Sequence, residues 1–281
     1  MKTYAYMGPV GTNSEEAALL FAGKDSDKAQ LVECASVAEV FELVDRGRAN
    51  YGVVPIENAL EGSVSATLDA LAFNQAETQI LAEAILDIHH ALFLAPGATL
   101  ADVKVVASHP QATAQCRRWI AAHLPACEIR AANSTAESAR LAASDPSIAG
   151  IGPHRAAELY GAVLYEDNIE DFLGNQTQFV LVGHDSLPSA DYNKTSLALF
   201  MKEDRPGTLL MILEEFSYAG LNLTKIESRP TKRALGDYMF IVDIEGYIDD
   251  LALRTAIDCL RLKLREVKIL GSYPAQRREE I

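Results

Sequence analysis

Polar side chains gather where apolar, strand-like runs of the sequence end and helical patterns begin. Gly11 and Thr12 follow the first run, and Glu57 and Asn58 follow the apolar run 51–56. Free N–H groups at a helix start attract anions, so Gly11 and Thr12 are candidates for holding a carboxylate, although an ordinary capped turn explains them equally well. Glu57 and Asn58 would place an acceptor and an amide donor at the mouth of a strand, which favours a functional role.

A third group follows the apolar run 103–108. Gln111 and Gln115 are four residues apart in a predicted helix over 110–123, so they share one face and suit carboxylate recognition, although solvent-facing glutamines are commoner. Ser108 stands at the predicted N-cap of this helix. His109 precedes a proline and is interpreted as structural, ranking below Ser108.

A fourth group, residues 174–179, leads into a predicted strand over 178–183, and Thr177 would attract no attention there by itself. The sequence contains no nucleophile elbow, P-loop, dinucleotide fingerprint or zinc motif. His89 and His90 are adjacent in an extended segment, where their side chains would point to opposite faces and share no metal. These residues predict an enzyme or binder for a small anionic ligand, without cofactor or metal.

Composition narrows the class further. The chain has 281 residues, 49% of them hydrophobic and 23% charged, which is ordinary for a globular protein of about two domains. A net charge of −14 gives no basic footprint for nucleic acid. No apolar run approaches the roughly 18 residues of a membrane span, and the start shows no signal peptide. Four scattered cysteines without a paired motif favour a reduced, cytoplasmic protein.

The order of elements predicts an α/β protein in two blocks. Residues 1–183 alternate strands with helices, and a long extended segment over 80–94 divides them into two lobes with a ligand cleft between them. Residues 184–193 are polar and carry a proline, as a linker does. Residues 194–281 follow the order βαββαβ of a ferredoxin-like domain. One face of such a sheet needs a cover, so a homodimer or homotetramer is expected.

Several short strings in this order resemble prephenate dehydratase with a C-terminal ACT domain. In the first block they are Gly8-Pro9-Val10-Gly11-Thr12, Gly52-Val53-Val54-Pro55-Ile56-Glu57-Asn58, Ser108-His109-Pro110-Gln111-Ala112, Ser134-Thr135-Ala136 and Asn175-Gln176-Thr177-Gln178-Phe179. In the second block they are Arg205-Pro206-Gly207, the run from Asn222 to Pro230, and Gly271-Ser272-Tyr273-Pro274. Each string is short, but this many in one order is specific, and the resemblance covers nearly the whole chain.

The resemblance implies lobes like those of periplasmic binding proteins, with prephenate between them. It implies a cofactor-free carbon–oxygen lyase that releases carbon dioxide and hydroxide to give phenylpyruvate. Thr177, Asn58, Ser108 and Gln115 match family positions implicated in turnover, with Glu57 less certain, and Gly11, Thr12 and Gln111 are expected to bind substrate. For the effector L-phenylalanine the expected residues are Gly207, Thr208, Leu209, Asn222 and Leu223, with Glu227 and Ser228 relaying its effect.

The sequence departs from the family pattern at two positions. Gln178 stands where the family has arginine beside the threonine. If this side chain meets the substrate, the substitution Gln178→Arg is expected to change KM more than kcat, and if it points away from the cleft, little changes. Thr208 replaces the alanine of a Gly-Ala-Leu motif, which would alter effector affinity. The chain begins at its first predicted strand, which indicates a monofunctional enzyme. Arogenate dehydratase and a non-catalytic amino-acid sensor remain alternatives.

Overall fold

The chain separates into two compact units in the computed structural model, which describes residues 1–23, 28–74, 77–185, 190, 193–203 and 205–276. The first unit contains Met1–Val40, Val53–Val64 and Ile85–Phe179. The second contains Phe41–Gly52, Ser65–Ala84 and Val180–Ile281. Three stretches of the predicted catalytic block, 41–52, 65–84 and 180–183, therefore belong to the same unit as the C-terminal block. Most of the predicted linker 184–193 lies outside the described residues, and its boundaries stay a prediction.

The first unit opens with a small sheet. Strand β1 (Thr3–Met7) pairs in parallel with β2 (Gln30–Cys34), from Thr3 opposite Gln30 to Met7 opposite Cys34. On the other side of β1 lies β3 (Tyr51–Asn58), which forms a short hairpin with β4 (Gly62–Ser63). Helix α1 (Asn13–Ala22) follows β1. Because β3 continues to Asn58, Glu57 and Asn58 lie at the end of the strand and not in a turn beyond it.

Some elements contain a boundary between the two units. They are α2 (Val37–Asp45), β3, β5 (Gln79–Asp87) and β11 (Gln176–Gly183). Strands β5 and β6 (Ala91–Leu94) confirm the predicted extended segment over 80–94, with the break where the two histidines stand. Strand β11 begins at Gln176, two residues before the prediction, so Thr177 is a strand residue.

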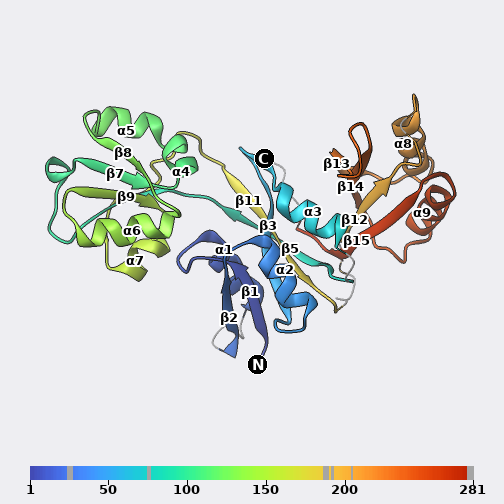
Figure 1. The fold of residues 1–281 in the computed structure, drawn as a ribbon, viewed down its shortest axis with the longest axis horizontal. Helices are drawn as coiled ribbons and strands as arrows, with labels where there is room; N and C mark the ends of the chain where they lie inside the picture. Colours follow the sequence, from blue (N-terminus) through green and yellow to red (C-terminus); the bar gives the residue numbers. More distant parts are fainter. Residues whose placement is uncertain (24–27, 75–76, 186–189, 191–192, 204, 277–281) are drawn as a thin grey trace. The chain divides into compact units, whose positions relative to one another are not determined.

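The rest of the first unit is built on a five-stranded sheet in the order β10-β6-β9-β7-β8. Figure 1 labels β7, β8 and β9 of this sheet together with its helices. Its remaining strands are β7 (Val105–Ser108), β8 (Glu128–Ala131), β9 (Ile148–Gly152) and β10 (Val163–Glu166), and η2 (Leu100–Asp102) precedes β7. Its helices are α4 (Pro110–Gln115), α5 (Arg117–His123), α6 (Thr135–Ser144) and α7 (His154–Tyr160). Leu92 packs towards Cys116 and Ile120, whereas Phe93 packs towards α6 and α7, so helices cover both faces.

Two details of this sheet differ from the prediction. The helix expected over 110–123 is broken at Cys116, because Asp171 binds both sides of the break. The N–H of Asp171 donates to the carbonyl of Gln115 (2.7 Å), and its carboxylate accepts from the N–H of Arg118 (3.0 and 3.1 Å). Strand β10 was not predicted, since its residues are all exposed and give no burial pattern. Gly150 allows α6 close to β9, because a Cβ there would lie 2.6 Å from the Ser138 carbonyl oxygen.

The second unit contains the predicted βαββαβ domain. Its sheet has the order β13-β14-β12-β15, all antiparallel. Its elements are β12 (Asn193–Phe200), α8 (Thr208–Tyr218), β13 (Leu223–Pro230), β14 (Tyr238–Glu245), α9 (Leu251–Lys263) and β15 (Glu266–Pro274). Leu253, Ile257 and Leu260 are spaced along one face of α9 and pack with Ile212 and Phe216 of α8 in one core. Within the described residues, no helix is long and apolar enough to cross a membrane.

Residues of the predicted catalytic block join this domain through strand and ion-pair contacts. Gly271 of β15 pairs in parallel with Ile80 of β5, and a Cβ at Gly271 would lie 2.4 Å from the Ile80 carbonyl oxygen. Lys194 Nζ lies 2.9 Å from Glu83 Oε1, and the two side chains are 8% and 0% exposed. Removing one partner of such a buried pair strongly destabilises the folded protein.

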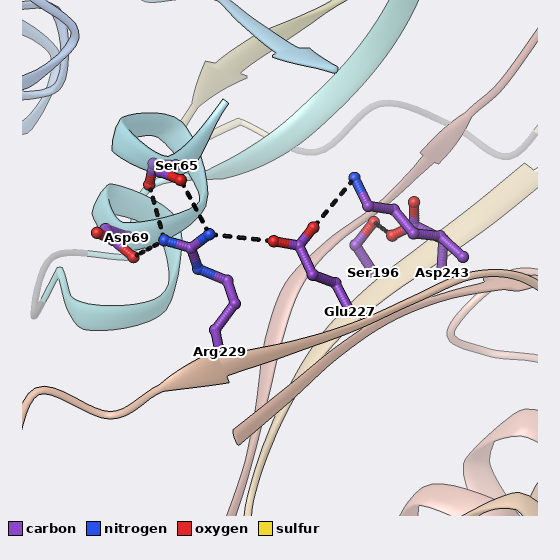
Figure 2. A network of polar contacts seen from close by, with 7 residues as sticks. Ser65, Asp69, Ser196, Glu227, Arg229 and Asp243 are labelled. Atoms are coloured by element: carbon purple, nitrogen blue, oxygen red, sulfur yellow. Dashed lines mark hydrogen bonds and ion pairs between the residues drawn. The ribbon is translucent and has the colours of Figure 1, made fainter. Parts of the chain in front are cut away.

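A second network links strand β13 to helix α3 (Ser65–Phe73) (Figure 2). Arg229 donates to Asp69 Oδ1 (2.6 Å) and to the hydroxyl of Ser65 (3.2 Å). Glu227 holds the same guanidinium at 3.0 Å, and Lys232 Nζ lies 2.6 Å from Asp69 Oδ2. The two cations hold the pKa of Asp69 below its usual value, against burial, which raises it.

Candidate active site

A pocket lies in the first unit, where the small sheet and the five-stranded sheet both contribute walls. Its lining includes the turn after β1, the β3–β4 hairpin, the start of α4, the start of α6 and the start of β11. The lining residues with polar or charged side chains are Thr12, Asn13, Ser14, Asn58, Glu61, Ser63, His90, His109, Gln111, Gln115, Asn133, Ser134, Thr135, Asn175 and Thr177. Lysine and arginine do not occur among the described lining residues. A ligand here meets amides, hydroxyls, histidines and the carboxyl group of Glu61.

Asn58 is the anchor of the polar wall. Its Oδ1 accepts hydrogen bonds from the backbone N–H groups of Leu60 and Glu61, each at 3.0 Å. Its Nδ2 lies 2.8 Å from Thr177 Oγ1 and 2.9 Å from Asn175 Oδ1. The hairpin between β3 and β4 supplies the two backbone donors, so the sharp turn after β3 orients this amide.

The chain of hydrogen bonds continues to a histidine. Asn175 Nδ2 donates to Gln115 Oε1 at 3.2 Å, and His90 Nε2 lies 2.8 Å from the same oxygen. Asn58, Asn175, Gln115, Thr177 and His90 are each at most 9% exposed. Hydrogen bonds in such a water-poor place hold side chains firmly, since an unpaired group there is costly.

Two donors at this wall face the pocket. Thr177 Oγ1 accepts from Asn58, and its hydroxyl proton meets no acceptor among the described residues. Gln115 uses its Oε1 for two neighbours, which leaves its amide N–H groups for a ligand. A hydroxyl and an amide aimed at the same space can hydrogen-bond an anion or a leaving oxygen.

Burial lowers the pKa of His90, and the nearby Gln115 and Glu170 oppose this shift only in part. The imidazole is therefore neutral at physiological pH. Its Nδ1 is buried and has no hydrogen-bond partner among the described residues. Glu170 holds the backbone N–H of His90 (3.0 Å) and lies 2.8 Å from His89 Nδ1, which fixes the backbone at this point.

Two helix starts also line the pocket. His109 is the N-cap of α4, and its Nδ1 accepts from the N–H of Gln111 at 3.3 Å. Ser134 is the N-cap of α6 and accepts from the N–H of Glu137 at 3.0 Å. Both residues line the pocket.

The structure gathers most of the predicted site residues and leaves others outside. Asn58, Gln115, Thr177, Gln111 and Thr12 line the pocket. Glu57, Ser108 and Gly11 are not among the described lining residues. Glu57 neighbours Asn58 in a strand, where successive side chains point to opposite faces.

The interpretation of Ser108 as an N-cap is wrong, because His109 caps the helix. Ser108 is fully buried at the end of β7 and donates to the Ile151 carbonyl oxygen at 2.6 Å. The idea of a free amide at Gly11 also fails, since its N–H donates to Glu15 Oε2 at 2.8 Å. That carboxylate also pairs with Arg155 at 3.0 Å.

Gln178 does not line the pocket, whereas its strand neighbours Thr177 and Phe179 do. Alternation along β11 turns the Gln178 side chain to the other face. The position at which the resemblance would place an arginine therefore lies outside this pocket.

The residues expected to bind an effector lie in the second unit. Gly207 adopts the left-handed conformation (φ 88°) that begins α8, and Thr208 donates its hydroxyl to the Arg205 carbonyl oxygen at 2.9 Å. Leu209 and Asn222 are exposed, Leu223 is half-buried, and Ser228 is exposed. Glu227 contacts Arg229 in the network of Figure 2.

Sequence reasoning missed Asn175 and His90 and ranked His109 too low. Asn175 stands two residues before Thr177, inside a string that the sequence had already marked. From the sequence, His90 suggests only a metal site shared with His89, which the opposite directions of adjacent strand side chains argue against. The helix after His109 begins with proline, and that signal marks the preceding residue as a cap.

Comparison with known proteins agrees with this architecture. A family model described as prephenate dehydratase matches residues 4–187, and one described as the ACT domain matches residues 195–258. The chain is 39% identical over 282 residues to a prephenate dehydratase of Mycobacterium bovis, covering 98% of this chain and 87% of that relative.

Two solved structures are similar over nearly the whole chain. Prephenate dehydratase from Arthrobacter aurescens in complex with L-Phe has a TM-score of 0.87 and 37% identity, covering 96% of this chain and 89% of that one. A structure described as GqqA, a novel type of quorum quenching acylase, has a TM-score of 0.86 and 28% identity, covering 98% of each chain. Both parts of the sequence are thus matched in order, and the chain belongs to the prephenate dehydratase family.

Proposed function

We propose that the pocket of the first unit is where the chain carries out its reaction, with Thr177 and Gln115 as the donors that contact prephenate. The activity is that of prephenate dehydratase, a hydro-lyase of phenylalanine biosynthesis. Prephenate has two carboxylates and a ring hydroxyl. As carbon dioxide leaves, the electrons of the broken C–C bond enter the ring, the C–O bond breaks, and the hydroxide takes up a proton to become water.

The observation that carries the assignment is the buried chain of side chains ending in two pocket-facing donors. A departing hydroxide gains negative charge in the transition state, and a fixed donor beside it stabilises that charge. Thr177 is suited to this place because Asn58 holds its oxygen at 2.8 Å and leaves its proton free to donate. The amide of Gln115 and the helix starts near His109 and Ser134 would hold the carboxylates.

The test measures phenylpyruvate release from prephenate and phenylalanine release from arogenate, using the intact chain, Asn58→Ala and Gln176→Ala. Asn58→Ala removes the anchor and should lower kcat by at least about tenfold. Gln176→Ala is the control, because its exposed side chain bonds Asp87 and does not line the pocket. Equal turnover by all three proteins would refute this pocket as the site, and a preference for arogenate would change the substrate.

Acylase activity, named in the description of the GqqA structure, has less support here. Acyl transfer to a side chain needs a nucleophile activated by a neighbouring base. Among the described hydrogen bonds, no pocket histidine contacts a serine or threonine hydroxyl. An N-acyl amide should therefore be included in the assay and should remain intact.

Regulation by L-phenylalanine is proposed for the second unit, through Gly207, Thr208, Leu209, Asn222 and Leu223. The Arthrobacter relative, 37% identical, is described as a complex with L-Phe. In this chain most of these residues are exposed at the start of α8 and of β13. Asn222→Ala should weaken L-phenylalanine binding in calorimetry and leave basal turnover unchanged. Unchanged binding would exclude Asn222 from the effector site.

The network of Figure 2 offers a route from the effector to the pocket. Arg229 holds Ser65, the first residue of α3, and Asp69 one turn later. The preceding residues Ser63 and Val64 line the pocket. A shift of β13 would therefore pull on the segment that follows Asn58, which is how Glu227 and Ser228 would relay binding without contacting the effector.

A homodimer or homotetramer in the cytoplasm completes the proposal. Ile226 on β13 and Tyr238 on β14 are 46% and 40% exposed, and a second copy of the domain could cover them. Light scattering of the purified chain tests the assembly, and a monomer at micromolar concentration would refute it.

A further inference from the structure

We propose that Asn175 is a positioning residue that transmits the direction of the hydrogen-bond chain from Asn58 to His90, and in this way fixes the tautomer of His90. The role for turnover depends on the function proposed above, whereas the direction of the chain can be measured without substrate. Asn175 is 4% exposed and stands between two other amides, so both its oxygen and its nitrogen have fixed partners.

The direction is imposed at the Asn58 end. Two backbone N–H groups, from Leu60 and Glu61, point at one atom of the Asn58 side chain, so that atom must be the oxygen. The Asn58 nitrogen then faces Asn175, whose oxygen must accept. Asn175 consequently presents its nitrogen to Gln115, and the atom of Gln115 that it meets must be the oxygen.

The other end of the chain fixes which ring nitrogen of His90 carries the proton. Its Nε2 lies 2.8 Å from an oxygen that can only accept, so Nε2 must carry the proton. A neutral imidazole then has an unprotonated Nδ1, which is the buried atom without a hydrogen-bond partner among the described residues. The same direction turns the Gln115 N–H groups to the pocket, where an anionic ligand needs donors.

The substitution Asn175→Asp reverses this arrangement with almost no change in shape. A carboxylate still accepts from Asn58, but it cannot donate to Gln115 Oε1. Gln115 must rotate its amide to donate, which presents its oxygen to the pocket and its nitrogen to His90. His90 must then accept at Nε2 and move its proton to Nδ1. The other ionisable groups near this place are His89 and Glu170 beside His90, and Glu61 and His109 in the pocket wall.

Protonation of the carboxylate that Asn175→Asp introduces would undo the reversal, because a neutral carboxyl group has one donor and one acceptor, as asparagine does. Burial raises the pKa of a carboxyl group above its ordinary value of about 3.9. At pH 8 Asn175→Asp should lower kcat/KM by roughly 10²-fold relative to the unsubstituted chain. This ratio should recover at least about tenfold as the pH falls towards 5. Asn175→Ala should stay impaired at every pH.

The matched control is Gln176→Glu, which makes the same amide-to-carboxylate change at the next residue, where the exposed side chain bonds Asp87 instead. Its kcat/KM ratio to the unsubstituted chain should stay near one. A ratio for Asn175→Asp that does not change with pH, or that equals the control at pH 8, would overturn a positioning role.

A second measurement needs no turnover. ¹⁵N NMR of the histidines in the unsubstituted, substrate-free chain should show His90 protonated at Nε2 only, with the resonance assigned through His90→Gln. Asn175→Asp at pH 8 should move the proton to Nδ1. A proton on Nδ1 in the unsubstituted chain would refute the inference whatever the catalytic result. If the unsubstituted chain shows the expected tautomer but does not turn over prephenate, only the proposed function is refuted.

Discussion

Replacing Thr177 with valine tests the central chemical claim, because the substitution removes one hydroxyl and keeps the branched shape that suits a strand. Thr177 is 9% exposed, and its oxygen accepts from Asn58 at 2.8 Å. If its proton stabilises the departing hydroxide, the loss of this one fixed donor should lower kcat by about 10²–10³-fold, or about 2.7–4 kcal/mol. KM should change little, because the interaction strengthens only as the C–O bond breaks.

The fold should tolerate the change. Asn58 Nδ2 keeps two acceptors, the Asn175 side chain at 2.9 Å and the Gln176 carbonyl at 3.2 Å. The cost in stability is then that of one hydrogen bond, about 0.5–1.5 kcal/mol. In a protein of this size such a loss lowers Tm by only a few degrees, roughly 2–4 °C per kcal/mol. Activity and stability therefore separate in this variant.

The assay is the formation of phenylpyruvate under saturating prephenate, with thermal unfolding measured on the same samples. Thr177→Ser keeps a hydroxyl at the same place and should retain kcat within about tenfold. A valine variant with kcat within threefold of the unsubstituted chain, about 0.65 kcal/mol, would remove Thr177 from the chemical step. An equal loss in the serine and valine variants would indicate that packing, and not the hydroxyl, matters.

Three further predictions concern positions outside the pocket. Lys194→Met removes the cation from the buried Glu83 carboxylate, so urea unfolding should show a loss of about 3–5 kcal/mol; a loss below about 1 kcal/mol would contradict the importance of the buried pair. Arg229→Gln should keep L-phenylalanine binding in calorimetry but weaken inhibition by about fivefold or more; unchanged inhibition would exclude the contact with Asp69 as a route. Gln178→Arg should leave kcat and KM within about twofold, and a large fall in KM would show that the side chain reaches the substrate.

The last of these reverses an expectation from the sequence. The sequence places a glutamine where the family has arginine, but it does not show which face of a strand the residue occupies. The prediction began the strand at Gln178, whereas β11 begins at Gln176. With Thr177 inside the strand, alternation decides that Thr177 faces the pocket and Gln178 does not. A shift of two residues in the start of this strand therefore changes the expected effect of Gln178→Arg on KM.

Local patterns predicted the elements well because they depend on neighbours in the chain. The βαββαβ order follows from apolar periodicity, and α9 shows it with Leu253, Ile257 and Leu260 on its buried face. The break at Cys116 depends on Asp171, a residue more than fifty positions away. No local signal could reveal it. The same reason explains why Asn175 escaped attention, since its partners Asn58 and Gln115 come from distant segments.

Ser108 shows the opposite error, in which a true local signal led to the wrong conclusion. Its type and position fit an N-cap, but His109 is the N-cap, and the Ser108 side chain instead bonds within the sheet. Its hydroxyl bonds the Ile151 carbonyl oxygen, which also accepts from Ser138 at 2.8 Å. Ser108 thus ties β7 to β9 beneath the start of α4. A substitution there would reach Gln111 and Gln115 through the backbone and not through substrate.

The distribution of charge in the pocket suits a decarboxylating elimination. In such a reaction negative charge leaves one carboxylate and collects on the departing hydroxide. A cation held against the departing carboxylate would stabilise the ground state more than the transition state, and only interactions that strengthen in the transition state raise kcat. The described lining contains no lysine or arginine, its one acidic side chain is that of Glu61, and Gln178 faces away from it. Neutral donors fixed by Asn58 and Asn175 can favour the leaving oxygen without binding the reacting carboxylate too tightly.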